Sequence, residues 1–134
     1  MGRRLIVDTN ILIGIAKGSV TATKLLCDDD DIAIAAVTKA ELLTGVLIDR
    51  DAVRRGQRRN QTEVILAGAQ ILTYTERTAS LHASLMAHTR QIGMPLGAHD
   101  LIIAAHAVEQ DRAIATLDAR ARFGDLPGVR AIEP

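Results

Sequence analysis

Short, uninterrupted apolar runs constrain the fold of this chain more than any other feature. Five such runs occur, the last of them after the turn at Pro127-Gly128: Leu5–Val7, Ile32–Ala35, Gln70–Thr73, Ala113–Thr116 and Val129–Ile132. Apolar strands without polar alternation are typical of a parallel sheet that is covered on both faces. Longer segments with helical spacing separate the runs. The sequence therefore predicts an α/β fold, a three-layer α/β/α sandwich around a mostly parallel sheet of about five strands.

The helical segments have local support. A stripe formed by Leu81, Leu85, His88 and Ile92 predicts a helix over residues 76–92, which ends at Gly93 and Pro95. The almost wholly apolar stretch 101–108 contains several alanines, which favours a buried helix over another strand. Residues 41–51 and 52–67 read as two helices, or as one helix bent around Gly56.

Length and cysteine content place the chain in a broad class. Its 134 residues fit a single domain, 1–134, and Cys27 is the lone cysteine, which excludes an internal disulfide and fits a reducing compartment. We expect Cys27 to be buried as a small apolar residue. The first apolar run stops at Asp8, too early for a signal peptide or a membrane span. The expectation is a soluble, cytoplasmic protein without a membrane partner.

Aromatic content excludes one kind of nucleic-acid binder, whereas the net charge argues against another without deciding the matter. Sixteen Lys and Arg balance sixteen Asp and Glu, so the chain is no simple basic binder. If four acids bind cations, however, the sixteen basic side chains outnumber the twelve remaining acidic ones, and the bound ions attract phosphate. One Tyr, one Phe and no Trp cannot build an aromatic platform on which several bases stack. The acidic run 28–31 is expected to be a solvated turn.

Four acids follow the predicted strands or begin the helices after them. They are Asp8, Glu41, Asp100 and Asp118. The carboxyl ends of parallel strands share one edge of a sheet, where α/β folds place their sites. Asp100 lies at the same edge if the helix over residues 76–92 runs antiparallel to the strands and the loop after it returns to the carboxyl ends of the strands.

Most of these acids also have a structural explanation. Thr38-x-x-Glu41 has the form of a capping box, with Glu41 in the first turn of its helix. Asp100 gains from a helix dipole, and Asp118 can be an N-cap. Asp8 differs, because it follows a buried strand at once and is itself followed by two oxygen-bearing side chains. Four separate structural roles at one edge are a weaker explanation than one shared site.

Clustered carboxylates indicate which ligands and which reaction the site is suited to. Two of them about 4 Å apart repel by roughly 4 kcal/mol at an effective dielectric near 20, so a cluster binds protons or cations. An all-oxygen set without His or Cys suits Mg²⁺ or Mn²⁺. Such ions activate water, orient a phosphodiester and stabilise the departing oxygen. The sequence therefore favours metal-assisted hydrolysis of a phosphodiester.

Four motifs in this order resemble those of PIN-domain nucleases, and the resemblance covers essentially the whole chain. They are Val7-Asp8-Thr9-Asn10, Thr38-x-x-Glu41-Leu42, Ala98-His99-Asp100-Leu101-Ile102 followed by Ala104, and Thr116-Leu117-Asp118. The short chain and its closing Leu126-Pro127-Gly128-Val129 are similar to the VapC toxins of bacterial toxin–antitoxin pairs. One departure is Leu117, where such toxins frequently have Asn.

The resemblance implies an endoribonuclease that depends on Mg²⁺ or Mn²⁺, a homodimer and a cognate antitoxin. It implies that Asp8, Glu41, Asp100 and Asp118 are both the catalytic acids and the metal ligands. Asn10 and Thr116 would support them by orienting ligands or waters.

Further residues are candidates for contacts with RNA or with the partner. The basic stretch holds Arg54, Arg55, Arg58 and Arg59, and it could grip phosphate or simply be solvated. His99, beside Asp100, could touch the substrate. The antitoxin is expected on an apolar face within residues 41–67, which is formed by Leu42, Leu43, Val46 and Leu47.

Two other classes stay open at this point. A phosphatase-like hydrolase that uses Asp8 as nucleophile would also carry a carboxylate after its first strand, although Asn10 stands where its second acid is usual. A non-catalytic partner-binding module would use the acids only as helix caps. A nuclease of this kind would depend on divalent ions, whereas such a binding module would not.

Overall fold

The sheet is fully parallel. The computed structural model describes residues 2–134, without the side chain of residue 120. Its strands are β1 (Arg4–Val7), β2 (Asp31–Ala35), β3 (Gln70–Leu72), β4 (Ala113–Ala115) and β5 (Ala131–Ile132). They pair side by side in the order β3-β2-β1-β4-β5, and each pair is parallel. The five predicted strands and their parallel arrangement are confirmed.

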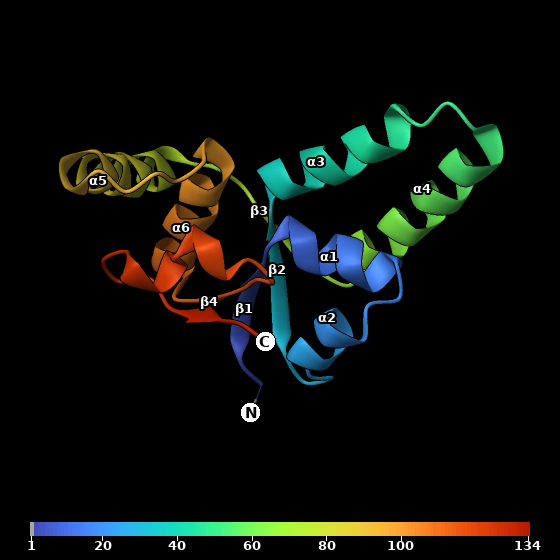
Figure 1. The fold of residues 1–134 in the computed structure, drawn as a ribbon, viewed down its shortest axis with the longest axis horizontal. Helices are drawn as coiled ribbons and strands as arrows, with labels where there is room; N and C mark the ends of the chain where they lie inside the picture. The colour runs from blue at the N-terminus through green and yellow to red at the C-terminus, as the bar shows by residue number, and fades with distance from the viewer. Residues whose placement is uncertain (1) are drawn as a thin grey trace.

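Helices cover both faces of this sheet, as the uninterrupted apolar runs predicted (Figure 1). One outer layer contains α5 (Glu76–Ile92) and α6 (Ala98–Gln110). The opposite layer contains α1 (Thr9–Ala16), α2 (Val20–Leu25), α3 (Ala36–Leu47) and α4 (Ala52–Ala67). Within β1, Ile6 packs in the core under α5 and α6, whereas Leu5 and Val7 pack in the core under α1. A strand that is buried on both faces leaves no position for polar alternation.

The sequence did not predict α1 and α2, which are short helices of eight and six residues. It left open whether residues 41–67 form one helix or two, and the structure shows two. The break falls at residues 48–51, and Gly56 lies inside α4. Asp51 begins α4 by accepting hydrogen bonds from the backbone of Val53 and Arg54. The chain therefore turns before Gly56, at a side-chain cap that suits a helix start.

The predicted capping box at Thr38 is wrong. Helix α3 begins at Ala36 after the N-cap Ala35, which makes no side-chain capping bond. Thr38 is fully buried within the helix, and Glu41 lies in its second turn rather than its first. The strand β2 runs directly into the helix, so the start of α3 precedes the residues that resemble a cap. Glu41 is thus free of the structural role that the sequence offered for it.

Arg112 joins the amino ends of three strands. Its buried guanidinium donates from Nη1 to the carbonyls of Leu5 (3.1 Å) and Asp31 (2.9 Å) and from Nη2 to Oε1 of Gln70 (3.2 Å). A buried cation keeps its charge only where such acceptors surround it. One side chain therefore links three strands at the sheet edge opposite the predicted site.

One smaller expectation is wrong, and another is confirmed only in part. Cys27 is exposed rather than buried. The acidic run is not simply solvated, because the Asp30 carboxylate is buried against the guanidinium of Arg3 at 2.7 Å. That contact holds the pKa of Asp30 down to about 2. No helix within residues 2–134 combines the length and the apolar character needed to cross a membrane.

Candidate active site

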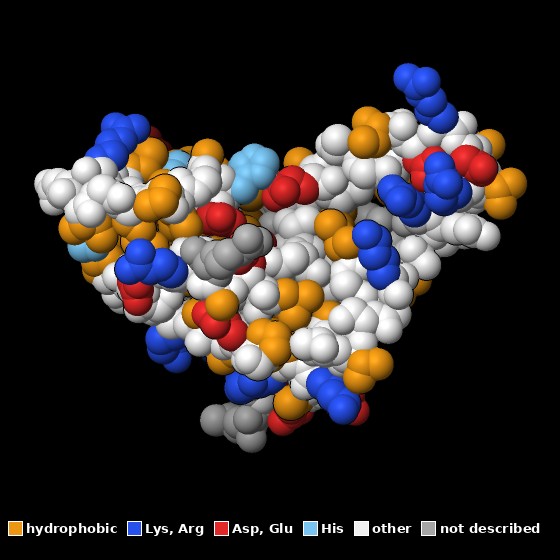
Figure 2. All heavy atoms as spheres, viewed as in Figure 1, with side chains coloured by type: hydrophobic (Ala, Val, Ile, Leu, Met, Phe, Trp, Pro, Cys, Tyr) orange, Lys and Arg blue, Asp and Glu red, His pale blue; other side chains and the backbone are white. Residues whose placement is uncertain are grey.

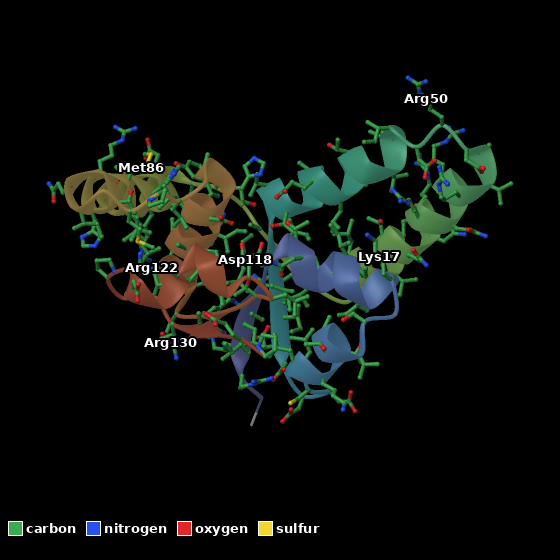
Figure 3. The ribbon with its side chains drawn as sticks, viewed as in Figure 1. Lys17, Arg50, Met86, Asp118, Arg122 and Arg130 are labelled. Atoms are coloured by element: carbon green, nitrogen blue, oxygen red, sulfur yellow. The ribbon has the colours of Figure 1, made fainter. Side chains whose placement is uncertain are left out.

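The connections between strands reverse direction at β1. The chain passes from β1 to β2 and β3 on one side, and then returns to β4 and β5 on the other. Parallel sheets bind ligands at the carboxyl ends of the strands where the order reverses. Asp8 directly follows β1, and Asp118 follows β4 after two intervening residues. Asp118 lies between the two helical layers in Figure 3.

Asp8 is buried and held on both carboxylate oxygens. Its Oδ1 accepts the backbone N–H of Thr9 at 2.8 Å. Its Oδ2 accepts the hydroxyl of Thr116 at 3.0 Å and the side-chain amide of Asn10 at 3.3 Å. Burial raises the pKa of Asp8, and the bonds from Thr116 and Thr9 offset part of that rise. The carboxylate therefore has a fixed orientation in a poorly solvated place.

Asn10 and Thr116 tie the loop after β4 to the start of α1. The Asn10 amide donates to Oγ1 of Thr116 at 3.2 Å, and its carbonyl oxygen accepts the backbone N–H of Leu117 at 3.0 Å. The same Thr116 oxygen accepts the backbone N–H of Asp118 at 3.0 Å. Both residues thus occupy the positions between Asp8 and Asp118 that a supporting role requires.

Glu41 reaches the site from α3 and meets two neighbours. The hydroxyl of Thr9 donates to its Oε1 at 3.2 Å. Nδ1 of His99, at the start of α6, lies 3.2 Å from the same oxygen. Glu41 therefore connects the start of α1 with the start of α6. The sequence grouped Thr9 with Asp8 but gave no sign of its contact with Glu41, because that contact joins two elements distant in the chain.

Asp100 completes the acidic group from the first turn of α6. Its pKa is raised to about 6, first by burial and then by the negative charges of Asp8, Asp118 and Glu41. The charges of Glu41 and Asp118 also raise the pKa of Asp8. Each predicted acid thus acts electrostatically on another, and Figure 2 shows acidic side chains gathering around the hollow between the layers. This cluster of negative charge would be stabilised by a cation.

The donor set fits a hard divalent ion that keeps part of its water shell. Among the residues that the structure describes, no three Asp, Glu, His or Cys side chains stand ready as a metal cage. Mg²⁺ commonly takes only one or two carboxylates, together with water and substrate phosphate. A carboxylate cluster with raised pKa values and without a closed cage suits such an ion.

The basic stretch has a structural role that the sequence did not predict. The Arg54 guanidinium donates two hydrogen bonds to the Asp49 carboxylate, at 2.8 and 3.0 Å. This contact holds the pKa of Asp49 down to about 2. Arg58 approaches the same carboxylate at 3.4 Å, and Arg55 donates to the Asp49 carbonyl at 3.0 Å. Three of the four arginines therefore close the turn between α3 and α4. Arg59 is exposed.

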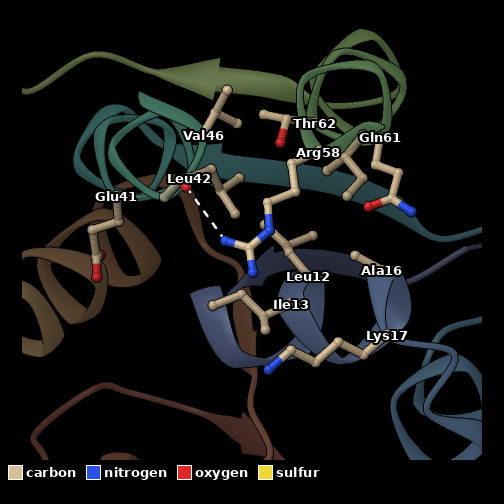
Figure 4. A pocket seen from close by; sticks show the side chains of 12 residues that line it. Leu12, Ile13, Ala16, Lys17, Glu41, Leu42, Val46, Arg58, Gln61 and Thr62 are labelled. Carbon is tan, nitrogen blue, oxygen red and sulfur yellow. Dashed lines mark hydrogen bonds between the residues drawn. The ribbon is translucent and has the colours of Figure 1, made fainter. Parts of the chain in front are cut away.

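An apolar groove of about 260 Å³ lies between α1, α3 and α4 (Figure 4). Its apolar lining includes Leu12, Ile13, Leu42, Val46 and Ile65. Glu41 stands at one end, and the cationic side chains of Lys17 and Arg58 line the groove farther along. The groove thus leads from an apolar, partly basic stretch to the acidic site.

The apolar face that the sequence predicted within residues 41–67 is divided. Leu42 and Val46 line the groove, whereas Leu43 and Leu47 are exposed and are not part of its lining. The contribution of α1 was missed, because the sequence did not predict that helix. Its eight residues are too few to display a helical stripe in the sequence.

Residues 5–127 match the PIN domain. The chain belongs to the PIN-domain family. It is 30% identical over 116 residues to Ribonuclease VapC of Rickettsia bellii, covering 87% of this chain and 86% of that protein. The fold matches VapBC2 from Rickettsia felis bound to a promoter DNA fragment, with a TM-score of 0.84, 22% identity and coverage of 97% and 98%. It also matches VapBC-5, of the VapBC toxin–antitoxin family, from Mycobacterium tuberculosis, with a TM-score of 0.80, 26% identity and 98% coverage of both chains.

Proposed function

We propose that this PIN-domain protein is the ribonuclease toxin of a toxin–antitoxin pair, and that it hydrolyses RNA phosphodiester bonds. The observation that carries the proposal is the convergence of four acids at the point where the strand order reverses, with the pKa of Asp100 raised to about 6. The similarity to Ribonuclease VapC supports the same activity. Family membership favours a nuclease over a phosphatase-like hydrolase.

The family implies a divalent metal ion, and we assign Mg²⁺ or Mn²⁺ to the carboxylates of Asp8, Glu41, Asp100 and Asp118. When bound, such an ion supplies Lewis acidity, lowers the pKa of water and neutralises charge on the departing oxygen. The protein holds the carboxylates in place for this purpose. Thr116 and Asn10 fix Asp8, and Thr9 fixes Glu41.

The remaining candidates for RNA contact lie outside the cluster of four acids. His99 stands at the rim, in contact with Glu41, where it can meet RNA. Arg59 and the outer surfaces of Arg54, Arg55 and Arg58 are the candidates for phosphate contacts farther along α4. Because three of these arginines already bind Asp49, their contribution to RNA affinity is expected to be modest.

The partner we propose is the cognate antitoxin, with a segment that lies in the groove between α1, α3 and α4. The VapBC complexes of similar fold support a toxin–antitoxin pairing. The apolar lining suits an amphipathic segment, and a basic side chain at the end near Glu41 could enter the acidic site. Such a side chain would compete with the ion. Assembly of the toxin as a homodimer, which the family resemblance implies, stays a prediction.

Cleavage of RNA by the purified chain tests the proposed activity. With Mg²⁺ or Mn²⁺ the protein should cut an RNA that contains unpaired loops, and EDTA should stop the reaction. Asp8→Asn should lower the rate by about a hundredfold or more, since it removes a charge that holds the ion. Asp29→Asn, in the exposed turn after α2, is the matched control and should keep full activity. Activity that persists in EDTA, or equal effects of the two substitutions, would contradict the proposal.

A further inference from the structure

One ring-bearing side chain contacts the acidic site directly. His99 lies with Nδ1 3.2 Å from Oε1 of Glu41, and 54% of its side chain is exposed. The single Phe and the single Tyr of the chain are engaged elsewhere. Phe123 is fully buried, and the Tyr74 hydroxyl bonds to His82 at 2.9 Å. A nucleobase at the site would therefore meet the imidazole of His99.

The position of His99 suits contact with a base rather than with the phosphate alone. The ring spans from α6 toward α3, where its Nδ1 contacts Glu41. Its half-exposed character leaves part of the ring accessible to solvent beside the acidic cluster. Because Glu41 is one of the carboxylates assigned to the ion, this ring lies within reach of the nucleotide next to the reacting phosphate. Figure 2 shows a histidine at the rim of the hollow, beside an acidic side chain.

Resting on the proposed function, we propose that His99 determines the base preference of cleavage by packing on the nucleobase next to the scissile phosphate. Proteins read RNA sequence mostly at unpaired bases, which stack on aromatic or histidine side chains and are recognised along their edges. A base inside a duplex is already stacked on its neighbours and cannot pack on this ring. The substrate is therefore unpaired RNA, with a preferred base at one position beside the cut.

A randomised single-stranded RNA pool, cut in the presence of Mn²⁺ and sequenced at the new ends, tests this inference. The wild type should show one enriched base at a position flanking the cut. His99→Ala should flatten the preference at that position and lower kcat/KM on the preferred sequence by about tenfold, with other positions unchanged. His99→Phe, which keeps a ring, should recover most of kcat/KM and alter the choice of base. His88→Ala, on α5, is the control and should keep the wild-type preference.

Three outcomes would overturn the inference. The first is a His99→Ala variant that keeps the wild-type base preference. The second is a variant that loses activity equally on every sequence, which indicates a role through Glu41 alone. The third is a His99→Phe variant as slow as His99→Ala, which excludes packing on a ring. A wild type that cuts no RNA in the pool contradicts the proposed function itself, so the two failures are distinguishable. Stabilisation by Mn²⁺ should be the same in His99→Ala as in the wild type.

Discussion

Individual residues differ in how far the sequence reveals them. Asp8 could be predicted as a candidate site residue because it directly follows a buried strand and is followed by two oxygen-bearing side chains, although the structure also shows it as the N-cap of α1. Arg112 could not be predicted, because its partners Leu5, Asp31 and Gln70 come from three different strands. A local pattern carries no information on which distant carbonyls a side chain will reach. The residue that joins the amino edge of the sheet therefore appears only in the structure.

Replacing Arg112 should weaken the fold severely. Its side chain is 2% exposed, and Arg112→Met would leave the carbonyls of Leu5 and Asp31 without their buried donor. We expect the free energy of unfolding to fall by about 3–5 kcal/mol, as measured by urea denaturation. Arg130→Met is the matched control, because the Arg130 side chain is 63% exposed and pairs with an exposed Asp111. The control should cost at most about 1 kcal/mol. Similar losses in both variants would contradict the role given to Arg112.

At the scale of helices and strands, long elements were predictable and short ones were not. The helix over residues 76–92 was predicted with its observed bounds, since its stripe spans several turns and ends at Gly93. The eight residues of α1 contain too few turns to display a stripe beside the neighbouring strand. Because α1 forms one wall of the groove, the docking face predicted within residues 41–67 did not include that wall. Leu47 was expected in that face and is outside the groove.

Substitutions in the groove and on the outer surface of α3 should show which of the two surfaces binds the antitoxin. Ile13 lines the groove and is 43% exposed, so Ile13→Asp places a charge where the apolar segment of the partner should pack. We expect the dissociation constant of the antitoxin complex, measured by calorimetry, to rise at least about tenfold. Leu47→Asp, at a residue 68% exposed outside the groove, should bind as the wild type does. The opposite ranking would move the partner to the outer face of α3.

At the scale of the whole molecule, the expected parallel sheet was enough to predict that the acids would lie at one edge. It was not enough to predict which elements would bring each acid there. The sequence located Asp8, Glu41 and Asp118 after strands, and it made the place of Asp100 depend on the return of the chain after residue 92. The structure places Asp100 in the first turn of α6, where the charges of the other three acids raise its pKa. The four acids therefore interact electrostatically although they are far apart in the sequence, and a local sequence pattern does not show such an interaction.

Divalent ions should stabilise the whole fold. An ion at a hundredfold its dissociation constant adds about 2.7 kcal/mol if it binds only the folded chain. The melting temperature should therefore rise with Mn²⁺ or Mg²⁺, and Asp100→Asn should lose most of that rise. The same variant should be more stable than the wild type without ions, since it relieves repulsion among the acids. Asp29→Asn should respond as the wild type does. A wild-type melting temperature that ignores both ions would contradict a shared cation site.

The order of the groove and the site along the chain has a consequence for synthesis. Every residue that lines the groove lies between Leu12 and Ile65, whereas the acidic site also needs Asp100 and Asp118. Chains are made and fold from the amino terminus. A growing chain therefore contains every residue of the groove proposed for the antitoxin before Asp100 and Asp118 have been translated. The groove is thus complete in the growing chain while two of the four acids of the proposed site are still missing.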